Sequence, residues 1–263
     1  MTKALWLNSL TTTVSAATSD FSRMTLHFCY GADIINGKEV SPPHSMPFMA
    51  LLETRQGPCC GGTLISPKWV LTAAHCYNES LRIEKVILGV QIRKAKSFIK
   101  HPCYDPLEKV NDLMLIKLDK PVKKSNTVKV RPLHKVEYPA AGTTCLVAGW
   151  GKTNNNAVKG SNVLMSVNVT VIDQVKCNSK EYYNFNPTIT RGHICAGSDG
   201  TNIADSCAGD SGGPLLCKGN VVGVTSFGNR CGVIKKPGVY AFLSKNTLWI
   251  KVYSKGTDLC TQV

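Results

Sequence analysis

The chain has 263 residues, of which 43% are hydrophobic and 18% charged, with 22 Gly and 13 Pro. This composition allows a buried core and argues against disorder, while the lack of repeats and of any apolar run near ~18 residues argues against collagen, a coiled coil or an integral membrane protein. The net charge is +14, from 31 Lys and Arg against 17 Asp and Glu. Such a charge favours anionic partners, among them sulfated glycans, nucleic acid and acidic proteins.

Cysteine is unusually frequent, with 12 residues. Cytosolic thiols are kept reduced, so this number indicates disulfides in an oxidising compartment or a metal site. The metal interpretation is the weaker one, because the chain has no C-x-x-C pair and its histidines lack zinc-finger spacing. We therefore predict disulfides in a secreted protein, with no metal and no cofactor.

Residues 1–33 differ from the rest of the chain. They are polar and rich in Thr and Ser, and the longest apolar run, residues 4–7, is too short for the core of a secretory signal. Cys29-Tyr30-Gly31 nevertheless places small residues where a signal peptidase would cut. Either the signal is atypical or the chain starts at an unnatural position; we expect a leader and a short propeptide here.

From Ile34 onward the sequence predicts an all-β protein with one terminal helix. Apolar runs separated by Gly, Pro, Asn and Lys predict strands near 48–52, 86–90, 113–118, 145–150, 165–171 and 221–227. The last segment, residues 244–255, has Ser244 as a cap, Gly256 as a stop, and an apolar face of Leu248, Trp249, Val252 and Tyr253. Short strands over about 210 residues favour one barrel or two paired barrels.

Three segments carry residues suited to nucleophilic catalysis. They place His75 beside Cys76, Asp112 before an apolar strand, and Ser211 within Gly209-Asp210-Ser211-Gly-Gly. A serine hydroxyl needs an adjacent base, which His75 can provide, and a buried Asp112 can fix the imidazole tautomer. The glycines allow the N–H groups of Gly209 and Ser211 to converge where an oxyanion would develop.

Each segment alone has an ordinary structural explanation, but together they occur in the order His, Asp, Ser. From Ile34 to about Lys255 the chain resembles the trypsin-like (chymotrypsin) family of serine proteases. The resemblance implies two antiparallel six-stranded β-barrels, at about 34–135 and 140–243, in a protease domain spanning 34–263. It also implies that Ser226 hydrogen-bonds the triad aspartate.

The same resemblance implies four disulfides, which are Cys60–Cys76, Cys145–Cys217, Cys177–Cys195 and Cys207–Cys231. Cys29, Cys59, Cys103 and Cys260 have no family partner.

The resemblance further implies cleavage after Lys or Arg. Asp205 lies six residues before Ser211, where family members with this pattern have the floor of the specificity pocket. Gly228 and Gly238 would be its open walls, next to Ser226 and Phe227. A buried, unpaired carboxylate is costly, so such a pocket favours a cationic substrate side chain. The calcium loop of digestive trypsins does not carry over, because residues 88–96 hold no carboxylates.

The activation segment points to one branch of the family. Ile34-Ile35-Asn36-Gly37 resembles the mature N-terminus, whose freed amine would pair with Asp210. Asp33 precedes it, where trypsinogen-like and clotting zymogens have Arg or Lys. A dipeptide Ala32-Asp33, removed by a dipeptidyl peptidase, is typical of the granzymes, proteases of leukocyte granules.

Other function classes remain open. A kallikrein or complement-type protease is one alternative, which the acidic residue before Ile34 disfavours. An inactive, protease-like binding protein is another, and the intact triad argues against it. A nucleic-acid-binding module would need aromatic side chains among the basic ones, and the basic segments lack them.

Three further expectations concern the surface. Residues 93–135 hold 12 Lys or Arg and 4 Asp or Glu, so we expect the loops around Lys94, Lys96, Lys123 and Lys124 to form a patch that binds proteoglycan; the alternative is a diffusely charged, solvated surface. Asn78 and Asn168 lie in glycosylation sequons. Cys103 would link a homodimer, as the matching cysteine does in the granzyme that this segment resembles, unless it pairs with Cys59 or Cys260 instead.

Overall fold

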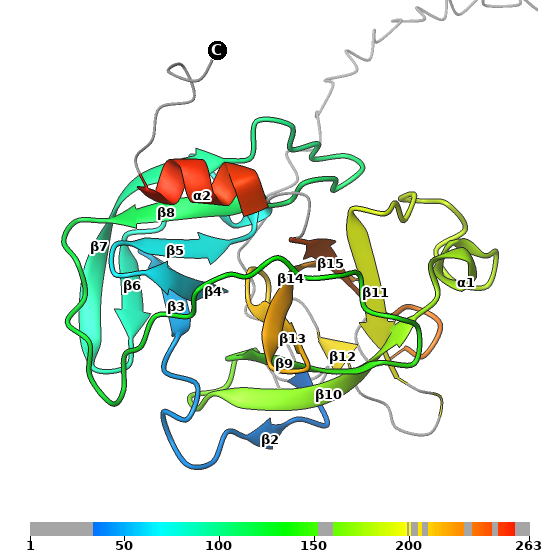
Figure 1. Ribbon diagram of the computed structural model, residues 1–263, viewed down its shortest axis with the longest axis horizontal. Coiled ribbons are helices and arrows are strands. Elements are labelled where there is room, and N and C mark those ends of the chain that lie inside the picture. Colours follow the sequence, from blue (N-terminus) through cyan, green and yellow to red (C-terminus); the bar gives the residue numbers. More distant parts are fainter. Residues whose placement is uncertain are drawn as a thin grey trace, which may run out of the picture.

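A computed structural model describes residues 34–151, 160–198, 200, 205–206, 210–228, 233–243 and 247–255. The leader, residues 1–33, lies outside this described part, as do Cys29, Cys207, Gly209, Cys231, Ser244 and Cys260. Two antiparallel barrels stand side by side, with helix α2 (Thr247–Lys255) across the outside of the first (Figure 1). The all-β prediction with two six-stranded barrels is confirmed.

Six strands close the first barrel, in the order β3-β4-β5-β8-β7-β6. Their bounds are β3 (Met49–Thr54), β4 (Gly57–Ser66), β5 (Trp69–Thr72), β6 (Lys85–Leu88), β7 (Gln91–Lys100) and β8 (Met114–Leu118). The barrel interior is aliphatic, and Leu52, Leu64 and Ile116 are fully buried in it. This core continues through Ala148 and Val224 into the contact with the second barrel.

The second barrel runs β9-β10-β11-β15-β14-β13 and closes because β9 pairs with β13. Its strands are β9 (Thr144–Gly149), β10 (Met165–Ile172), β11 (His193–Gly197), β13 (Pro214–Cys217), β14 (Asn220–Phe227) and β15 (Gly238–Phe242). A short β2 (Lys38–Glu39) adds to β10, and β1 (Ile34–Ile35) pairs with β12 (Asp205–Ser206).

Helical structure is sparse in the described residues. Asp173 caps α1 (Gln174–Asn178) by accepting hydrogen bonds from the N–H groups of Val175 and Lys176, and η1 (Ala74–Cys76) is a single 3-10 turn. In α2 the predicted apolar face is partly wrong. Leu248 is 70% exposed, whereas Ile250 is buried with Trp249 against the core of the first barrel, where the Trp249 ring lies 4.9 Å from that of His101.

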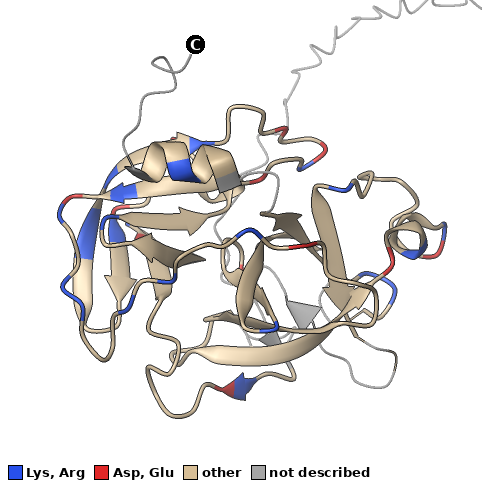
Figure 2. Cartoon of the chain, in the orientation of Figure 1, with Lys and Arg blue, Asp and Glu red and all other residues tan. Residues whose placement is uncertain are grey.

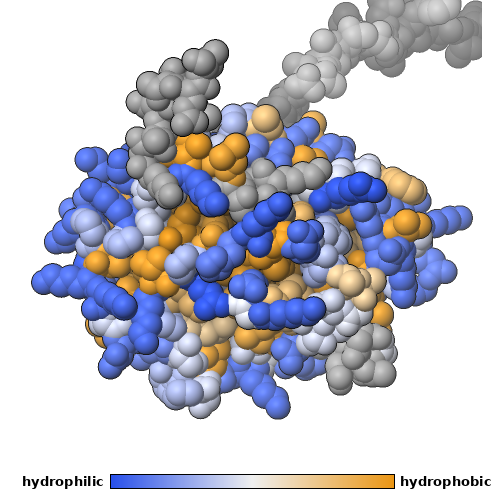
Figure 3. All heavy atoms as spheres, in the orientation of Figure 1, coloured by the Kyte–Doolittle hydropathy of each residue, from blue (hydrophilic) through white to orange (hydrophobic). Residues whose placement is uncertain are grey.

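The surface differs in character from the barrel interiors. Figure 3 shows one face covered mainly by hydrophilic side chains, with apolar atoms visible in patches between them. No helix among the described residues is long and apolar enough to cross a membrane.

Candidate active site

His75 and Asp112 come from the first barrel and lie in direct contact. Asp112 is fully buried immediately before β8, and η1 places His75 beside it. The Nδ1 atom of His75 is 2.7 Å from Oδ2 of Asp112, and the backbone N–H of His75 donates to Oδ1 at 2.9 Å. With Nδ1–H donating to the carboxylate, Nε2 of the imidazole is left with its lone pair, as a general base requires.

Ser226 on β14 reaches the same carboxylate from the second barrel. Its hydroxyl donates to Oδ2 of Asp112 at 2.5 Å, and both side chains are buried. Burial by itself would raise the pKa of Asp112, but the charge of His75 and the hydrogen bonds from His75 and Ser226 outweigh it and lower that pKa below its ordinary value. Asp112 is therefore a carboxylate at neutral pH.

Backbone contacts hold the Ser211 segment between the two barrels. The carbonyl oxygen of Ser211 accepts a hydrogen bond from the N–H of Gly61 on β4 at 2.8 Å. The N–H of Gly212 donates to the carbonyl of Thr225, the residue before Ser226, also at 2.8 Å. The Ser211 segment is thereby bonded both to β4, the strand that carries Cys60, and to β14, the strand that carries Ser226.

Gly212 explains why this segment needs small residues. Its φ is +79°, and a Cβ there would lie 3.1 Å from the backbone nitrogen of Ala73 and 2.6 Å from the carbonyl oxygen of Gly61. Ala73 is only two residues before His75, so the serine segment packs directly against the chain that carries the histidine. A larger residue at Gly212 would force the two apart.

The structure contains three of the four expected disulfides, and the fourth, Cys207–Cys231, lies outside the described residues. Cys60–Cys76, Cys145–Cys217 and Cys177–Cys195 are formed. Cys60–Cys76 joins β4 to η1, which fixes the turn that carries His75. The Sγ atoms of this pair and His75 are the potential metal ligands that cluster in the described residues, but the disulfide leaves no thiolate to bind an ion.

Residues expected to form the specificity pocket are only partly described. The backbone of Asp205 pairs with Ile35 in the β1–β12 ribbon, and its side chain is outside the described residues. Gly228 and Gly238 face each other, since a Cβ on Gly228 would lie 3.9 Å from the Cα of Gly238. Phe227 packs edge-on against Tyr183 and His193 behind them.

The activation residues are described in outline. The backbone of Ile34 pairs with Ser206, and Asp210, next to Ser211 in the sequence, is fully buried. Gly209, the other residue expected at the oxyanion hole, lies outside the described residues.

His193 is a residue that the sequence analysis missed. It is buried on β11 of the second barrel, and its Nε2 donates to the carbonyl of Lys109 at 3.0 Å while its Nδ1 accepts from the N–H of Thr190 at 3.1 Å. Burial lowers the pKa of His193. The neutral ring therefore anchors the loop before Asp112 to the second barrel. A lone histidine in a strand gives no sequence signal for such a role.

Comparison with known proteins agrees with this geometry. The family model described as Trypsin matches residues 34–250. Bovine granzyme A (Bos taurus) is 43% identical over 230 residues, covering 83% of this chain and 86% of that protein, and human kallikrein-4 is 41% identical over 229 residues, covering 84% and 87%. Among solved structures, mouse neuropsin, a serine protease expressed in the limbic system of the brain, superposes with a TM-score of 0.75 at 38% identity, covering 86% of this chain and 100% of that one.

Two closed barrels, a histidine–aspartate pair between them and a family match over most of the chain have one common explanation. This chain belongs to the trypsin family of serine proteases.

Proposed function

We propose that the chain is an endopeptidase that cleaves after Lys or Arg through an acyl-enzyme, as a granzyme A-like protease of cytotoxic lymphocytes. In this proposal Ser211 is the nucleophile, His75 the base and Asp112 the group that orients the base. The observation that carries it is the buried, ionised Asp112, bonded to both His75 and Ser226.

The chemistry follows from that arrangement. Nε2 of His75 accepts the hydroxyl proton as Ser211 attacks the scissile carbonyl carbon, and the oxygen becomes an oxyanion facing the N–H groups of Gly209 and Ser211. The imidazolium then gives the proton to the departing amine, leaving an ester on Ser211. Water hydrolyses the ester by the same route, with His75 as base. Asp112 stabilises the imidazolium in both halves.

Specificity for Lys and Arg rests on Asp205 and on the two facing glycines. Gly228 and Gly238 lie close together, and because neither has a side chain, neither would fill the pocket that a long substrate side chain must enter. A carboxylate at the floor would pair with the substrate cation.

Substitution of Asp205 tests this specificity. Asp205→Ser is expected to lower kcat/KM for Lys and Arg esters by about a thousandfold or more, while labelling of Ser211 by a fluorophosphonate persists. Asp205→Glu, which keeps the charge, serves as the matched control and should retain a preference for cations. An Asp205→Ser variant that still strongly prefers Arg contradicts the pocket assignment.

Activation is proposed to follow removal of Ala32-Asp33. The acidic residue before Ile34 supports this over cleavage by a trypsin-like activator. A chain extended by this dipeptide should be inactive, a dipeptidyl aminopeptidase should restore activity, and trypsin should not. Full activity of the extended chain would contradict the idea.

The finer assignment to a secreted or granule-stored granzyme is supported by the 43% identity to bovine granzyme A, although human kallikrein-4 is nearly as similar. Granzyme K and a complement-type protease remain the other candidates. An exposed Cys103 supports a disulfide-linked homodimer. A non-reducing gel decides this point: a wild-type band at monomer mass, unchanged by Cys103→Ser, argues against the dimer.

Two surface modifications complete the proposal. Asn168 is exposed on β10, so it is the better N-glycan acceptor, and Asn78 is partly exposed. Lys94, Lys96, Lys123 and Lys124 are all exposed, which supports binding of anionic glycans such as granule proteoglycan. Glycosidase treatment of the secreted protein and salt elution from heparin are the corresponding measurements.

A further inference from the structure

The hairpin between β6 and β7 has an apolar tip. Val90, at the turn, is 76% exposed, and Ile92, at the start of β7, is 58% exposed. Ile87 lies directly opposite Ile92 in the register, and alternate residues of a strand share one face. The turn of the hairpin therefore carries Val90, and the aliphatic pair Ile87 and Ile92 follows it on the outer face.

Cations follow this tip on the same face. Lys85 and Lys94 are paired two residues further along the two strands, and both are exposed. Lys96 lies next along β7 and is also exposed. Figure 2 shows Lys and Arg repeated along β7 and the adjoining edge of the first barrel. The hairpin thus changes from apolar to basic along its length.

A second basic segment is fixed beside the hairpin by Gln91. The amide of Gln91 donates to the carbonyl of Lys123 at 2.5 Å, and its oxygen accepts from the Lys123 N–H at 3.0 Å. The same oxygen accepts from the guanidinium of Arg93 at 2.6 Å. These bonds hold Lys123 and Lys124 next to the tip rather than leaving them on a separate loop.

The cations of this surface are largely uncompensated. The Lys and Arg ion pairs of the described residues are Arg55–Glu84, Lys85–Glu53 and Lys235–Glu181, so only Lys85 of this surface has a carboxylate within 4.0 Å. Asp119 is a further acid near this surface; its carboxylate accepts from the backbone N–H of Lys94 and interacts electrostatically with Lys120 and Arg93.

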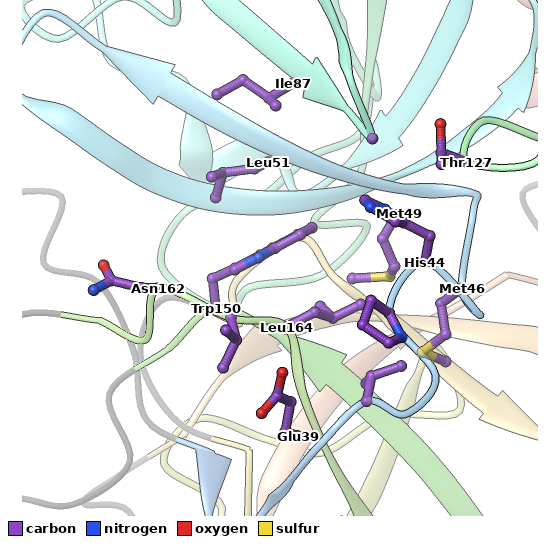
Figure 4. Close-up of a pocket in the computed structure, with 14 residues that line it drawn as sticks. Glu39, His44, Met46, Met49, Leu51, Ile87, Thr127, Trp150, Asn162 and Leu164 are labelled. Atoms are coloured by element: carbon purple, nitrogen blue, oxygen red, sulfur yellow. The ribbon is translucent and has the colours of Figure 1, made fainter.

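Apolar surface continues behind the hairpin. A groove of about 360 Å³ is lined by Ile87 and Gly89 of the hairpin together with Leu51, Met49 and Trp150. In Figure 4 Ile87 and Leu51 stand at one end of this groove, on neighbouring strands. Through Ile87 the exposed tip adjoins this groove, which Glu39 and His44 also line at its other end.

We propose that this hairpin tip docks on an anionic lipid bilayer. Val90 and Ile92 would enter the boundary between headgroups and acyl chains, while Lys94, Lys96, Lys123 and Lys124 contact lipid phosphates. A sulfated glycan would pair with the lysines but leave Val90 and Ile92 in water. A bilayer would pair with the lysines through its phosphates and also bury the two aliphatic side chains. Lysine stems can lie along apolar surface with their ammonium groups at the phosphates. This docking goes beyond the proposed protease function and does not depend on it.

The test is sedimentation of the mature protein with vesicles of phosphatidylcholine alone or mixed in equal parts with phosphatidylserine. Wild type should bind the mixed vesicles and not the neutral ones, and added salt should weaken binding. Val90→Ser with Ile92→Ser should lower binding by about tenfold, because aliphatic burial is lost. The salt needed to elute this variant from heparin should stay unchanged.

Two comparisons make the test decisive. Val175→Ser with Leu248→Ser removes equally exposed aliphatic side chains from α1 and α2 and should bind as wild type does. Lys94→Gln with Lys96→Gln should weaken both vesicle and heparin binding. Hydrolysis of a soluble Lys ester should be the same in all these variants, which separates this proposal from the proposed function.

Two results would overturn the proposal. The first is an absence of wild-type binding to the mixed vesicles at low salt. The second is unchanged vesicle binding after Val90→Ser with Ile92→Ser, which would mean that the surface recognises polyanions by charge alone.

Discussion

The two barrels have the same architecture but different chemical surfaces. Residues 34–135 hold 17 Lys or Arg and 8 Asp or Glu, whereas residues 140–243 hold 9 and 5. The first barrel supplies His75 and Asp112, and the second supplies Ser211 and Ser226, which reaches across to Asp112. The strands of each barrel hydrogen-bond with one another, but the residues of the candidate site come together only where the two barrels meet. The proposed catalytic residues thus come from both barrels, while the excess positive charge lies mainly in the first.

Removing the nucleophile should have the largest effect. Ser211→Ala is expected to lower kcat for a Lys ester by roughly 10⁴–10⁶-fold, because the second barrel would contribute no attacking group. The kcat of the activated protein for a Lys ester, measured in a stopped assay, checks this expectation. Gly228→Ala, which narrows only the pocket, should instead retain fluorophosphonate labelling. A Ser211→Ala enzyme with near wild-type turnover would refute the triad assignment.

Removing the hydrogen bond from Ser226 of the second barrel to Asp112 of the first should lower activity less. Ser226→Ala removes one hydrogen bond to a buried carboxylate, which is worth about 1.5–3 kcal/mol, so kcat/KM should fall roughly tenfold to a hundredfold. His75 still holds Asp112 through two hydrogen bonds. Urea unfolding of the same variant shows whether stability falls with it. Unchanged kcat/KM would mean that the first barrel positions its own aspartate.

Acid should loosen the contact made by His193. Its pKa in the folded protein is lowered by burial from the ordinary 6.5, so the unfolded chain takes up the proton first. Stability is therefore fully present above about pH 6.5 and falls as the pH drops from there toward the folded pKa. Asp112 and Glu108 are the charged groups that act on this ring, and Lys109 contacts it through its backbone carbonyl.

Unfolding in urea across this pH range checks that expectation. His193→Gln can keep a donor toward Lys109 without titrating, so it should flatten the pH dependence between the folded and unfolded pKa values. Lys129→Gln, a charge change elsewhere in the first barrel, should leave the slope as in wild type. An unaltered slope in His193→Gln would contradict the role given to the ring.

Neutralising lysines of the more basic first barrel is expected to have the smallest effect on catalysis. Neutralising Lys123 and Lys124 to Gln should lower the salt needed for elution from heparin, and neutralising Lys176 and Lys180 of the second barrel should change it less. Hydrolysis of a small ester should be unaltered in both variants. Equal shifts for the two pairs would show that the basic surface is diffuse.

The strands that the sequence predicted are those that stand out as apolar runs between loop residues. The predicted runs at 86–90, 113–118 and 221–227 correspond to β6, β8 and β14. Strand β4 was missed because Pro58, Gly61 and Gly62 argue against a strand. Tertiary contacts explain the glycines: a Cβ on Gly61 would lie 3.3 Å from the Cα of Gly213, and one on Gly62 would lie 2.7 Å from a Val70 methyl.

Site residues divide in the same way. His75, Asp112 and Ser211 lie in recognisable local motifs, so the sequence predicted them, and the structure joins the first two at 2.7 Å. His193 and Gly61 act through partners 84 and 150 residues away, namely Lys109 and Ser211. No local pattern encodes such partners, so only the folded chain reveals them.

The hydrogen bond between Ser226 and Asp112 also has a consequence for biosynthesis. It joins residues 114 positions apart, and its second half lies on β14, near the end of the domain. A nascent chain that has completed the first barrel holds His75 and Asp112 but neither Ser211 nor Ser226. Translation order therefore keeps a potentially destructive hydrolase incomplete until almost the whole domain has left the ribosome.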